Sequence, residues 1–280
     1  MTPSVPGGGM TPADIRAGYS KLQPDIPWTH HFDLGEFETI SPERDDKFYR
    51  KAIGLKRIGE LGCQYAQLFT KKAGVEGARV LDVACGEGGH AIGFARLGAA
   101  EVIGIEGRQL YVDRARFAAT ALGVPNVRFE LGDVRKIDPS RVGTFDFVFC
   151  SGILHHLGAD DFTSFLKTMG TLTADTMMIY THVSSPASVK MFNLTGPHVI
   201  EKGIDGHLFR EHADNADAQE RERQVRASLD NTFSFWGTEA SVIHGLKLGG
   251  FGAIAKIFEP HAFAGYDNRN IRVMFIARKL

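Results

Sequence analysis

Short apolar runs alternate with amphipathic segments through the middle of the chain. We expect strands at 78–85, 101–106, 127–131, 145–151 and 176–183, and helices at 88–97, 108–123 and about 160–171. Strict alternation of strand and helix predicts right-handed βαβ units. Such units place helices on both faces of the sheet, so the sequence predicts an α/β fold with a doubly wound, mostly parallel sheet.

The two flanking regions carry different patterns. Residues 41–69 are charged and have apolar positions at mostly helical spacing, which predicts one or two helices. A polar stretch follows the last parallel strand, and we then expect a helix at about 238–248 and a hairpin of two strands, 251–260 and 270–279, that adds an antiparallel edge. Four regions result: an N-terminal extension with helices, a core, an inserted segment and a C-terminal helix with hairpin, at 1–77, 78–182, 183–237 and 238–280.

Composition narrows the possible partners. The chain has 280 residues, 43% of them hydrophobic, which is enough for a sizeable core. Its formal net charge of −1 gives no field that would capture a polyanion, so a small molecule or an oligosaccharide is favoured over nucleic acid, although a local basic patch stays open. Cys63, Cys85 and Cys150 lack metal-binding spacing, which favours reduced thiols in the cytoplasm. No apolar run approaches the roughly 18 residues of a membrane span.

The loop after the first strand reads LDVACGEGGHA. Its residues Gly86, Gly88 and Ala91 satisfy the weak dinucleotide pattern G-x-G-x-x-A. In a dinucleotide site, however, the pyrophosphate rests on the helix N-terminus, and a carboxylate at the strand end would repel it. Asp82 occupies that position, four residues before Gly86. The loop therefore favours a cationic ligand.

Acidic residues also follow the next two strands. Glu106 closes the second strand and can accept hydrogen bonds from both hydroxyls of a ribose. Asp133 follows the third strand, where it can accept a hydrogen bond from an adenine amino group. Ligands of open parallel sheets bind beyond the carboxyl ends of the strands. The acids and the glycine turn together indicate a positively charged nucleoside without phosphates, and S-adenosylmethionine is that molecule.

At these residues the sequence resembles the class I S-adenosylmethionine-dependent methyltransferases. The resemblance covers about residues 78–182 and includes LDVACGEGG, GIEG, GDV and FDFVFCSGILHHL, in that order. It implies a seven-stranded sheet of order 3-2-1-4-5-7-6 whose last strand is antiparallel, in agreement with the predicted hairpin.

The resemblance also implies roles for individual positions. Asp82 with the turn at Ala84, Gly86 and Gly88 would hold the methionine part; Glu106 and Gly107 the ribose; Asp133 and Val134 the adenine; and Ser151 with Gly152 would lie beside the sulfonium. Ala84 stands where the family commonly has Gly, a departure that still permits close approach of the backbone.

A narrower resemblance extends beyond the core. WTHHFDLGE, GHLFREH and SLDNTFSFWGTEAS look like a branch that includes the tRNA wobble-uridine carboxymethyltransferases and small-molecule O-methyltransferases. The tRNA enzymes tend to carry Tyr-His where this chain has His155-His156. We therefore predict methyl transfer to a hydroxyl of a small-molecule or carbohydrate acceptor, with a tRNA-modifying enzyme as the alternative and a non-catalytic cofactor-binding module as the third class.

Three histidines follow the fourth and fifth strands and are candidates for a general base: His155, His156 and His182. An alcohol is a poor nucleophile, and a base that removes its proton typically adds about 10²- to 10⁴-fold in rate. Neutral imidazole is available for this at pH 7. Adjacent side chains on a helical turn point about 100° apart, so only one of His155 and His156 would face the substrate. We expect this to be His155, because it replaces the aromatic residue of the relatives.

Substrate contacts are expected from both flanking regions. Trp28, His30 and His31 would form a lid or a structural plug, and the inserted segment would form a substrate cap, with polar contacts from Arg210 and His212 and a stacking wall, or the cap's own core, from Phe233, Phe235 and Trp236. Its charged part, 211–230, reads as a solvated helix.

A metal and a second copy are further expectations. His182, Glu259 and His261 follow strand ends on one sheet edge, where Mg²⁺ could chelate a vicinal diol, but their spacing does not require it. The N-terminal helices and the charged cap could each serve a homodimer interface.

Overall fold

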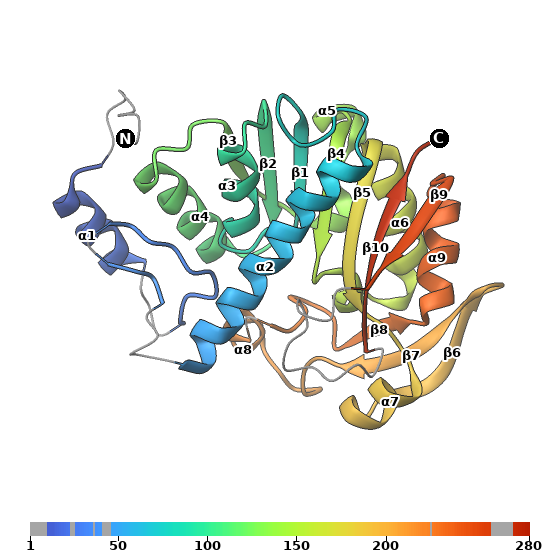
Figure 1. The fold of residues 1–280 in the computed structure, drawn as a ribbon. Helices are drawn as coiled ribbons and strands as arrows, with labels where there is room; N and C mark the ends of the chain where they lie inside the picture. The colour runs from blue at the N-terminus through green and yellow to red at the C-terminus, as the bar shows by residue number, and fades with distance from the viewer. Residues whose placement is uncertain (1–9, 23–25, 36, 41–45, 225, 259–270) are drawn as a thin grey trace.

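A seven-stranded sheet forms the centre of the computed structural model, which describes residues 10–22, 26–35, 37–40, 46–224, 226–258 and 271–280 (Figure 1). Its strands are β1 (Arg79–Val83), β2 (Glu101–Glu106), β3 (Val127–Leu131), β4 (Phe145–Ser151), β5 (Thr173–His182), β9 (Ala253–Ile257) and β10 (Arg272–Arg278). Their order is β3-β2-β1-β4-β5-β10-β9. The first five run parallel, and β10 is antiparallel to both of its neighbours. The predicted fold class and strand order are confirmed.

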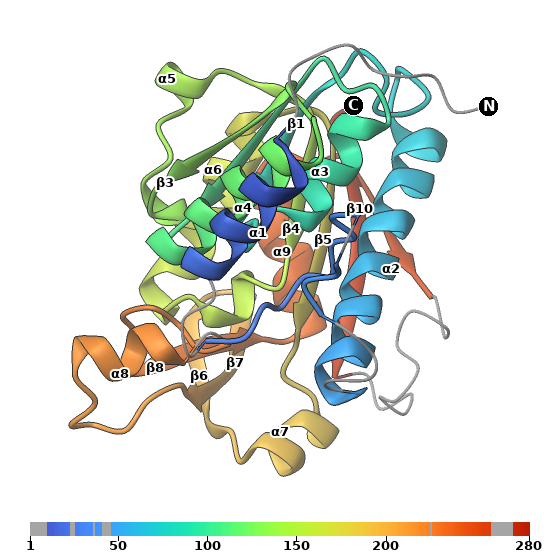
Figure 2. The same ribbon diagram turned by 90° about the vertical axis from the view of Figure 1, so that its left-hand side faces the viewer.

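Helices cover both faces of this sheet (Figures 1 and 2). One layer contains α1 (Pro12–Lys21), α2 (Asp46–Phe69), α3 (Gly89–Arg96) and α4 (Gln109–Ala121), and the other contains α5 (Pro139–Val142), α6 (Ala159–Leu172) and α9 (Glu239–Leu248). The central strands are buried on both sides, which explains their nearly continuous apolar sequences. None of the helices among the described residues combines the length and the apolar character that crossing a membrane requires.

A small second sheet follows β5. The strands β6 (Thr195–Glu201), β7 (Ile204–Arg210) and β8 (Phe233–Gly237) form an antiparallel sheet in that order, and the short helices α7 (Pro186–Phe192) and α8 (Ala218–Arg223) flank it. We call residues 183–237 the cap. The cap lies beyond the carboxyl ends of the parallel strands (Figure 1).

The cap contains two departures from the expected pattern. The hydrophobic and polar pattern did not predict its sheet, because β6 is exposed at almost every position and alternation is therefore absent. In the described part of the charged stretch, 211–224 and 226–230, the structure has the six-residue α8 rather than a long helix.

Two glycines allow α6 and α9 to approach closely. A Cβ atom built on Gly170 of α6 would lie 1.9 Å from the carbonyl oxygen of Gly249, which ends α9. The backbone of one helix would have to shift to accept an alanine here. Gly93 of α3 differs, because a Cβ at that position would meet nothing within 4 Å.

We predict that Gly170→Ala lowers the free energy of unfolding by about 1–3 kcal/mol, the usual cost of overpacking. Gly93→Ala, the matched control, is expected to leave stability unchanged or to raise it by up to about 1 kcal/mol through helix propensity. Urea denaturation measures both. Equal effects of the two substitutions would contradict the close packing of α6 on α9.

Candidate active site

A tight loop connects β1 to α3. Its backbone enters the left-handed region at Ala84 (φ 57°), Gly86 (φ 56°) and Gly88 (φ 80°). A Cβ on Gly88 would lie 2.5 Å from the Phe129 ring, so both conformation and space require glycine there. Ala84 is a non-glycine residue in the same strained region, at the position where the resemblance led us to expect Gly. The loop thus turns tightly at the end of β1, with a methyl group or no side chain at each of its left-handed positions.

Two buried carboxyl groups stand beside this loop. Asp82 is almost completely buried, and its Oδ2 has no hydrogen-bond partner among the described residues. Burial raises the pKa of Asp82 to about 8. Glu106, at the end of β2, accepts hydrogen bonds of 2.9 Å from the backbone N–H groups of Gly86 and Arg108, and burial raises its pKa as well. A buried carboxyl oxygen without a donor is costly, so this site suits a ligand that brings a donor or a positive charge.

The third strand ends at a more exposed acid. Asp133 accepts a hydrogen bond from the backbone N–H of Arg135, and the Arg135 guanidinium contacts both of its carboxyl oxygens at 2.9 Å. Although partial burial opposes it, these contacts hold the pKa of Asp133 below its usual value. Val134 is buried beneath this turn. At the end of β4, after Ser151, Gly152 turns the chain with φ 79° and donates its N–H to Tyr180 O.

A buried ion pair attaches the N-terminal segment, residues 26–35, to the glycine loop. Glu87 lies inside the loop and Arg114 lies on α4; both side chains have no solvent exposure, and Arg114 Nη1 is 2.6 Å from Glu87 Oε1. The backbone N–H groups of Thr29 and His30 donate to Glu87 Oε2 at 2.8 and 2.7 Å. Burial alone would raise the pKa of Glu87, but the hydrogen bonds from His30 and the charge of Arg114 hold it below its usual value.

The ion pair places His30 directly on the loop. A Cβ added to Gly86 or Gly89 would lie 2.9 or 2.7 Å from the His30 ring. Trp28 is buried, and the Arg114 guanidinium stacks 4.7 Å from the centre of its ring. Trp28 therefore belongs to the anchor of the segment, whereas His30 covers the loop.

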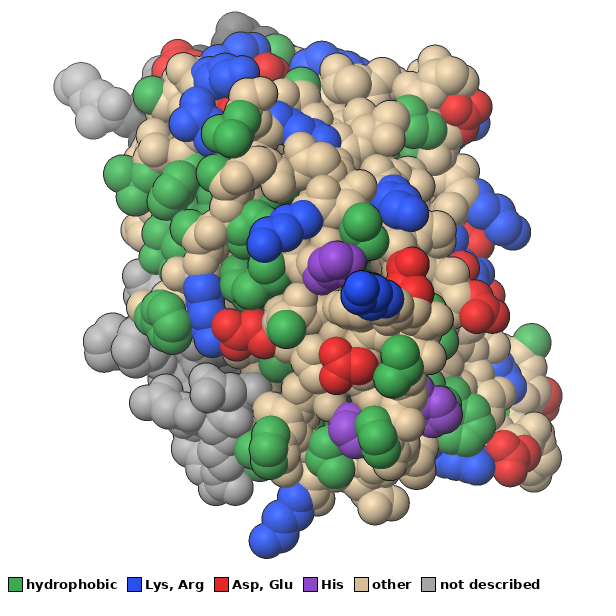
Figure 3. Space-filling view, turned by 90° about the vertical axis from the view of Figure 1, so that its right-hand side faces the viewer, with side chains coloured by type: hydrophobic (Ala, Val, Ile, Leu, Met, Phe, Trp, Pro, Cys, Tyr) green, Lys and Arg blue, Asp and Glu red, His purple; other side chains and the backbone are tan. Residues whose placement is uncertain are grey.

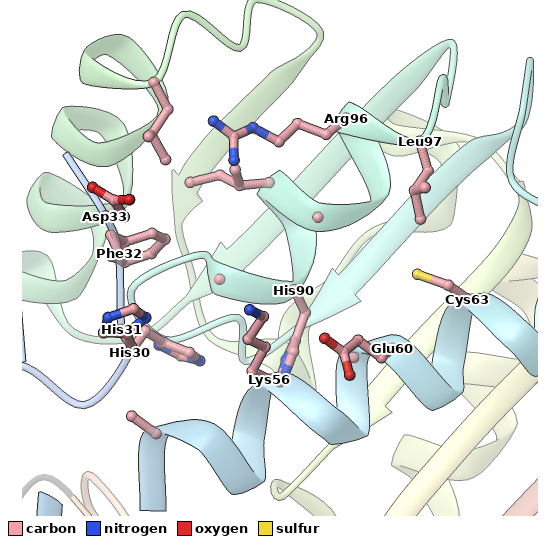
Figure 4. A pocket seen from close by; sticks show the side chains of 16 residues that line it. His30, His31, Phe32, Asp33, Lys56, Glu60, Cys63, His90, Arg96 and Leu97 are labelled. Carbon is pink, nitrogen blue, oxygen red and sulfur yellow. The ribbon is translucent and has the colours of Figure 1, made fainter. Parts of the chain in front are cut away.

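A pocket of about 300 Å³ lies behind His30, between the N-terminal segment, α2 and α3 (Figure 4). His31, Lys56 and Glu60 are among the residues that line it. His90, at the start of α3, separates this pocket from the sheet; its Nε2 donates to Leu55 O at 2.8 Å, and burial lowers its pKa to about 3. The pocket lies on the outer side of α3 and not at the carboxyl ends of the strands.

The three candidate histidines form one cluster. His155 and His156 lie in a 3₁₀ turn after β4, and His182 ends β5. The ring centre of His155 is 4.2 Å from that of His156 and 4.5 Å from that of His182, and Trp236 of β8 packs 4.6 Å from His182. The structure therefore brings together residues as far apart in the sequence as His155 and Trp236.

Two members of the cluster are deeply buried and neutral. Burial lowers the pKa of His155 well below its usual value, and burial together with the charge of Arg272 lowers the pKa of His182 to about 2. His182 Nε2 accepts a hydrogen bond of 2.8 Å from Arg272 Nε. His155 Nδ1 lies 3.1 Å from Thr181 Oγ1 and 3.4 Å from the backbone N–H of His182.

His156 has a different partner. Its Nδ1 lies 2.7 Å from Oε1 of Glu211, the residue that follows β7 in the cap. The sequence analysis did not identify Glu211, which sits in the motif GHLFREH between two residues that were selected, Arg210 and His212. Only the position of this motif at the end of a strand could have signalled it, and that strand was not predicted.

Other selected residues have structural partners. Arg210 pairs with Asp214 and stacks on Phe233 at 4.9 Å, near the surface of the cap. His212 is buried and donates from Nε2 to Ser228 O at 2.6 Å. Phe235 is fully buried and packs on Phe162, which corresponds to the cap-core alternative. Trp236 and Glu211 adjoin the histidine cluster instead, as does Phe192 of α7, whose ring centre lies 5.5 Å from that of His182.

The sequence analysis considered a Mg²⁺ site. In the part of the chain that the structure describes, no group of three or more His, Cys, Asp or Glu side chains is arranged to hold a metal ion. Glu259 and His261 lie outside the described residues.

The cap also covers the ends of β2 and β3. Arg108 Nη2 lies 3.2 Å from the carbonyl oxygens of Gln224 and Ala227, and the Leu229 side chain would be 3.4 Å from a Cβ on Gly107. Arg135, which holds Asp133, also binds Asp230 of the cap at 2.5 Å. The N-terminal segment and the cap therefore close the strand ends from opposite sides.

Comparison with known proteins identifies the core. Residues 80–175 match a family model described as a methyltransferase domain. The core therefore contains a methyltransferase domain, on a sheet with the strand order that the class I resemblance implied. Two curated methyltransferases share part of it. The ubiquinone biosynthesis O-methyltransferase of Neisseria meningitidis serogroup C is 30% identical over 128 residues, 46% of this chain and 53% of the relative. The 23S rRNA (uracil(1939)-C(5))-methyltransferase RlmD of Shewanella sp. strain ANA-3 is 36% identical over 96 residues, 29% of this chain and 21% of the relative. The chain thus spans about half or less of the length of these methyltransferases.

Solved structures resemble the methyltransferase core together with its flanking regions. The N-terminal domain of EvdMO1 with SAH bound has a TM-score of 0.72 and 21% identity, with 97% of this chain and 98% of that chain covered. The same domain in the presence of SAH and D-fucose has a TM-score of 0.69 and 21% identity over 97% and 98% of the two chains. The magnesium protoporphyrin IX methyltransferase of Synechocystis PCC 6803 has a TM-score of 0.55 and 14% identity over 84% and 88%. At these identities the likeness shows the fold.

We predict that Arg114→Met destabilises the protein by about 3–5 kcal/mol, because it leaves the Glu87 carboxylate buried without its counter-charge. Arg116→Met is the matched control on the same helix. Arg116 is exposed, and its guanidinium donates to Phe129 O and to no other described residue, so its loss is expected to cost no more than about 1.5 kcal/mol. Urea denaturation followed by circular dichroism measures both. A similar loss in the two variants would contradict the anchoring role of the ion pair.

Proposed function

We propose that this protein transfers a methyl group from S-adenosylmethionine to a hydroxyl of a small-molecule or carbohydrate acceptor. The observation that carries the proposal is the unpartnered, buried Oδ2 of Asp82 beside the strained glycine loop, on a methyltransferase core. S-adenosylmethionine carries both a sulfonium and an ammonium group, and either its charge or its N–H donors would compensate this carboxyl. The SAH-bound structural neighbour supports the same cofactor.

The residues at the strand ends suit the separate parts of the cofactor. We assign the methionine part to Asp82 and to the loop at Ala84, Gly86 and Gly88, the ribose to Glu106 and Gly107, the adenine to Asp133 and Val134, and the neighbourhood of the sulfonium to Ser151. Glu106 favours a ribose because its two oxygens can exchange backbone donors for hydroxyl donors of the same kind. When bound, the cofactor supplies an electrophilic methyl group.

The protein then has to orient an acceptor oxygen, exclude water and receive a proton. In-line positioning at about 3–3.5 Å supplies most of the acceleration in such transfers. The N-terminal segment and the cap supply the exclusion of water, because they cover the strand ends from two sides. One imidazole of the histidine cluster supplies the proton acceptor for a hydroxyl.

The acceptor class rests on the cap. Trp236 is buried beside the histidines, and its Nε1–H has no hydrogen-bond partner among the described residues. An indole donor next to aromatic rings suits an acceptor that combines a flat apolar face with hydroxyl oxygens, as sugars and phenols do. The ubiquinone-pathway relative is named as an O-methyltransferase, and one structural neighbour was studied in the presence of D-fucose.

A tRNA-modifying activity is the second candidate, because the curated relatives include rRNA methyltransferases. Nucleic-acid binding relies on clustered Lys and Arg side chains. On the face that carries α9 and β9, basic and acidic side chains are interspersed (Figure 3). This distribution, together with a net charge of −1, favours the small acceptor. The three free cysteines support a cytoplasmic location.

We predict that cofactor binding releases a proton at Asp82. Below pH 8 this carboxyl is protonated in the free protein, because burial raises its pKa to about 8, whereas a cationic ligand binds the carboxylate. The affinity for S-adenosylmethionine should therefore fall by up to about tenfold per pH unit below pH 8. Titration calorimetry in two buffers of different ionisation enthalpy measures the released proton. Asp82→Asn should make the heat of binding independent of the buffer. Equal heats of binding in both buffers with the wild-type protein would contradict the release of a proton at Asp82.

The acceptor class is testable by methyl transfer. Tritiated S-adenosylmethionine should label at least one member of a panel of glycans and phenols, and should label tRNA no more than a no-enzyme control does. Assays with and without Mg²⁺ test the metal. Labelling of tRNA alone would replace the proposed acceptor by the second candidate, and labelling of no substrate with no cofactor binding would contradict the proposed function.

A further inference from the structure

The three histidines of the cluster differ in which ring nitrogen already takes part in a hydrogen bond. His182 Nε2 accepts from Arg272 Nε, so the lone pair of that atom is already engaged. His155 Nδ1 accepts from the backbone N–H of His182, so the neutral ring of His155 carries its proton on Nε2 and presents a donor. Neither ring offers a free basic nitrogen, and both are deeply buried.

His156 has the opposite arrangement. Its Nδ1 lies 2.7 Å from Glu211 Oε1, and its side chain retains 19% exposure while that of Glu211 retains 1%. An ionised carboxylate only accepts hydrogen bonds, so Nδ1 carries the proton of the neutral ring and Nε2 keeps its lone pair. A carboxylate that holds one ring nitrogen in this way fixes the tautomer and stabilises the imidazolium that forms when Nε2 takes a proton.

Glu211 is itself fixed by donors of the cap. Its Oε1 also accepts from Ser234 Oγ at 2.7 Å, and its Oε2 accepts from the backbone N–H of Ser228 at 3.1 Å. These contacts satisfy both carboxylate oxygens, which a buried charge requires. The Ser228 donor belongs to the backbone and cannot reverse its direction. Whatever side chain stands at position 211, the atom that faces the Ser228 N–H must therefore be an acceptor, that is, an oxygen.

The histidine turn is joined to the same part of the cap. Asn231 Nδ2 donates to His156 O at 3.1 Å, and the backbone N–H of Phe235 donates to Leu157 O at 2.8 Å. The backbone of the turn and the orientation of the His156 ring are thus held by residues of one short segment, 211–235. The turn itself begins at Leu154, two residues after Gly152 and three after Ser151, which ends β4.

We propose that His156 is the general base of the methyl transfer and that Glu211 is the positioning residue that holds its Nδ1–H tautomer. This inference rests on the proposed function and replaces the sequence-based preference for His155. The acceptor O–H bond breaks and its proton goes to His156 Nε2 while the oxygen forms a bond to the methyl carbon. The electron pair of the broken S–CH₃ bond stays on sulfur, which changes from a sulfonium to a neutral thioether. The imidazolium then returns its proton to solvent.

Glu211→Gln tests the pair with little change of shape. The Ser228 N–H keeps the amide oxygen on its side, so the amide NH₂ faces His156 Nδ1 and donates to it. The proton of the ring then moves to Nε2, which removes the base. We expect kcat for the acceptor found in the methyl-transfer screen to fall by about 10²- to 10⁴-fold, the usual contribution of a general base. KM and the affinity for S-adenosylmethionine should stay within about twofold, because Glu211 contacts neither ligand in this mechanism.

The spectroscopic readout does not depend on activity. Long-range ¹H–¹⁵N correlation spectra should show His156 as the Nδ1–H tautomer in the wild-type protein and as the Nε2–H tautomer in Glu211→Gln. The matched control is Glu201→Gln. Glu201 is a cap carboxylate at the end of the exposed strand β6, and it accepts a hydrogen bond from Thr163 Oγ1 of α6. It should leave both kcat and the His156 spectrum unchanged. His156→Ala should lose activity and regain part of it with added imidazole.

The outcomes separate the two proposals. Wild-type protein that binds no S-adenosylmethionine and labels no acceptor would overturn the proposed function. If the wild-type protein is active, two results would overturn the roles of His156 and Glu211 alone. One is an unchanged kcat in Glu211→Gln, and the other is a wild-type His156 in the Nε2–H tautomer. If Glu211→Gln fails to fold, His156→Ala decides: full activity in that variant overturns the base assignment, and imidazole rescue supports it.

Discussion

The ion pair between Glu87 and Arg114 is the contact on which the cofactor side of the molecule depends. It brings two opposite charges together without solvent, which is favourable only when further hydrogen bonds satisfy both groups. Those hydrogen bonds come from the N-terminal segment: backbone N–H groups for Glu87, and the carbonyl oxygens of Ile26 and Pro27 for Arg114. The charge pair therefore cannot form completely unless the segment is in place. The loop between β1 and α3 is thus held by a segment that lies 58 residues earlier in the chain.

The cap uses arginine in a comparable way on the other side. Arg108 and Arg135 each follow a strand of the core, and each binds acceptors of the segment between α8 and β8. Guanidinium groups suit this task because they offer several donors in a fixed plane. The residues beside which the cofactor is proposed to bind, Glu106 and Asp133, are therefore also the residues next to the cap attachments. Closure of the cap and completion of the ligand site depend on the same short stretches of chain.

The sequence predicted the parts of the fold that depend on local pattern. The strand order followed from alternating strands and helices together with the family resemblance, and the acids at the strand ends followed from the rule that ligands bind there. The sheet of the cap was missed, because β6 is exposed along nearly its whole length and shows no alternation. Glu211 and Arg114 were missed for another reason. Each acquires its role from a partner 55 or 27 residues away, and neither has an unusual neighbour in the sequence.

The histidine cluster shows why neighbouring residues of one type need not share one role. Three imidazoles within contact distance can hold few protons, because each added charge raises the cost of the next in a region with little water. Burial lowers the pKa of His182, and the positive charge of Arg272 lowers it further; burial also lowers the pKa of His155. Among the described residues, a carboxylate faces the cluster at His156, through Glu211. In the proposed mechanism the cluster thus provides two neutral rings beside the acceptor and one ring, His156, that takes the proton.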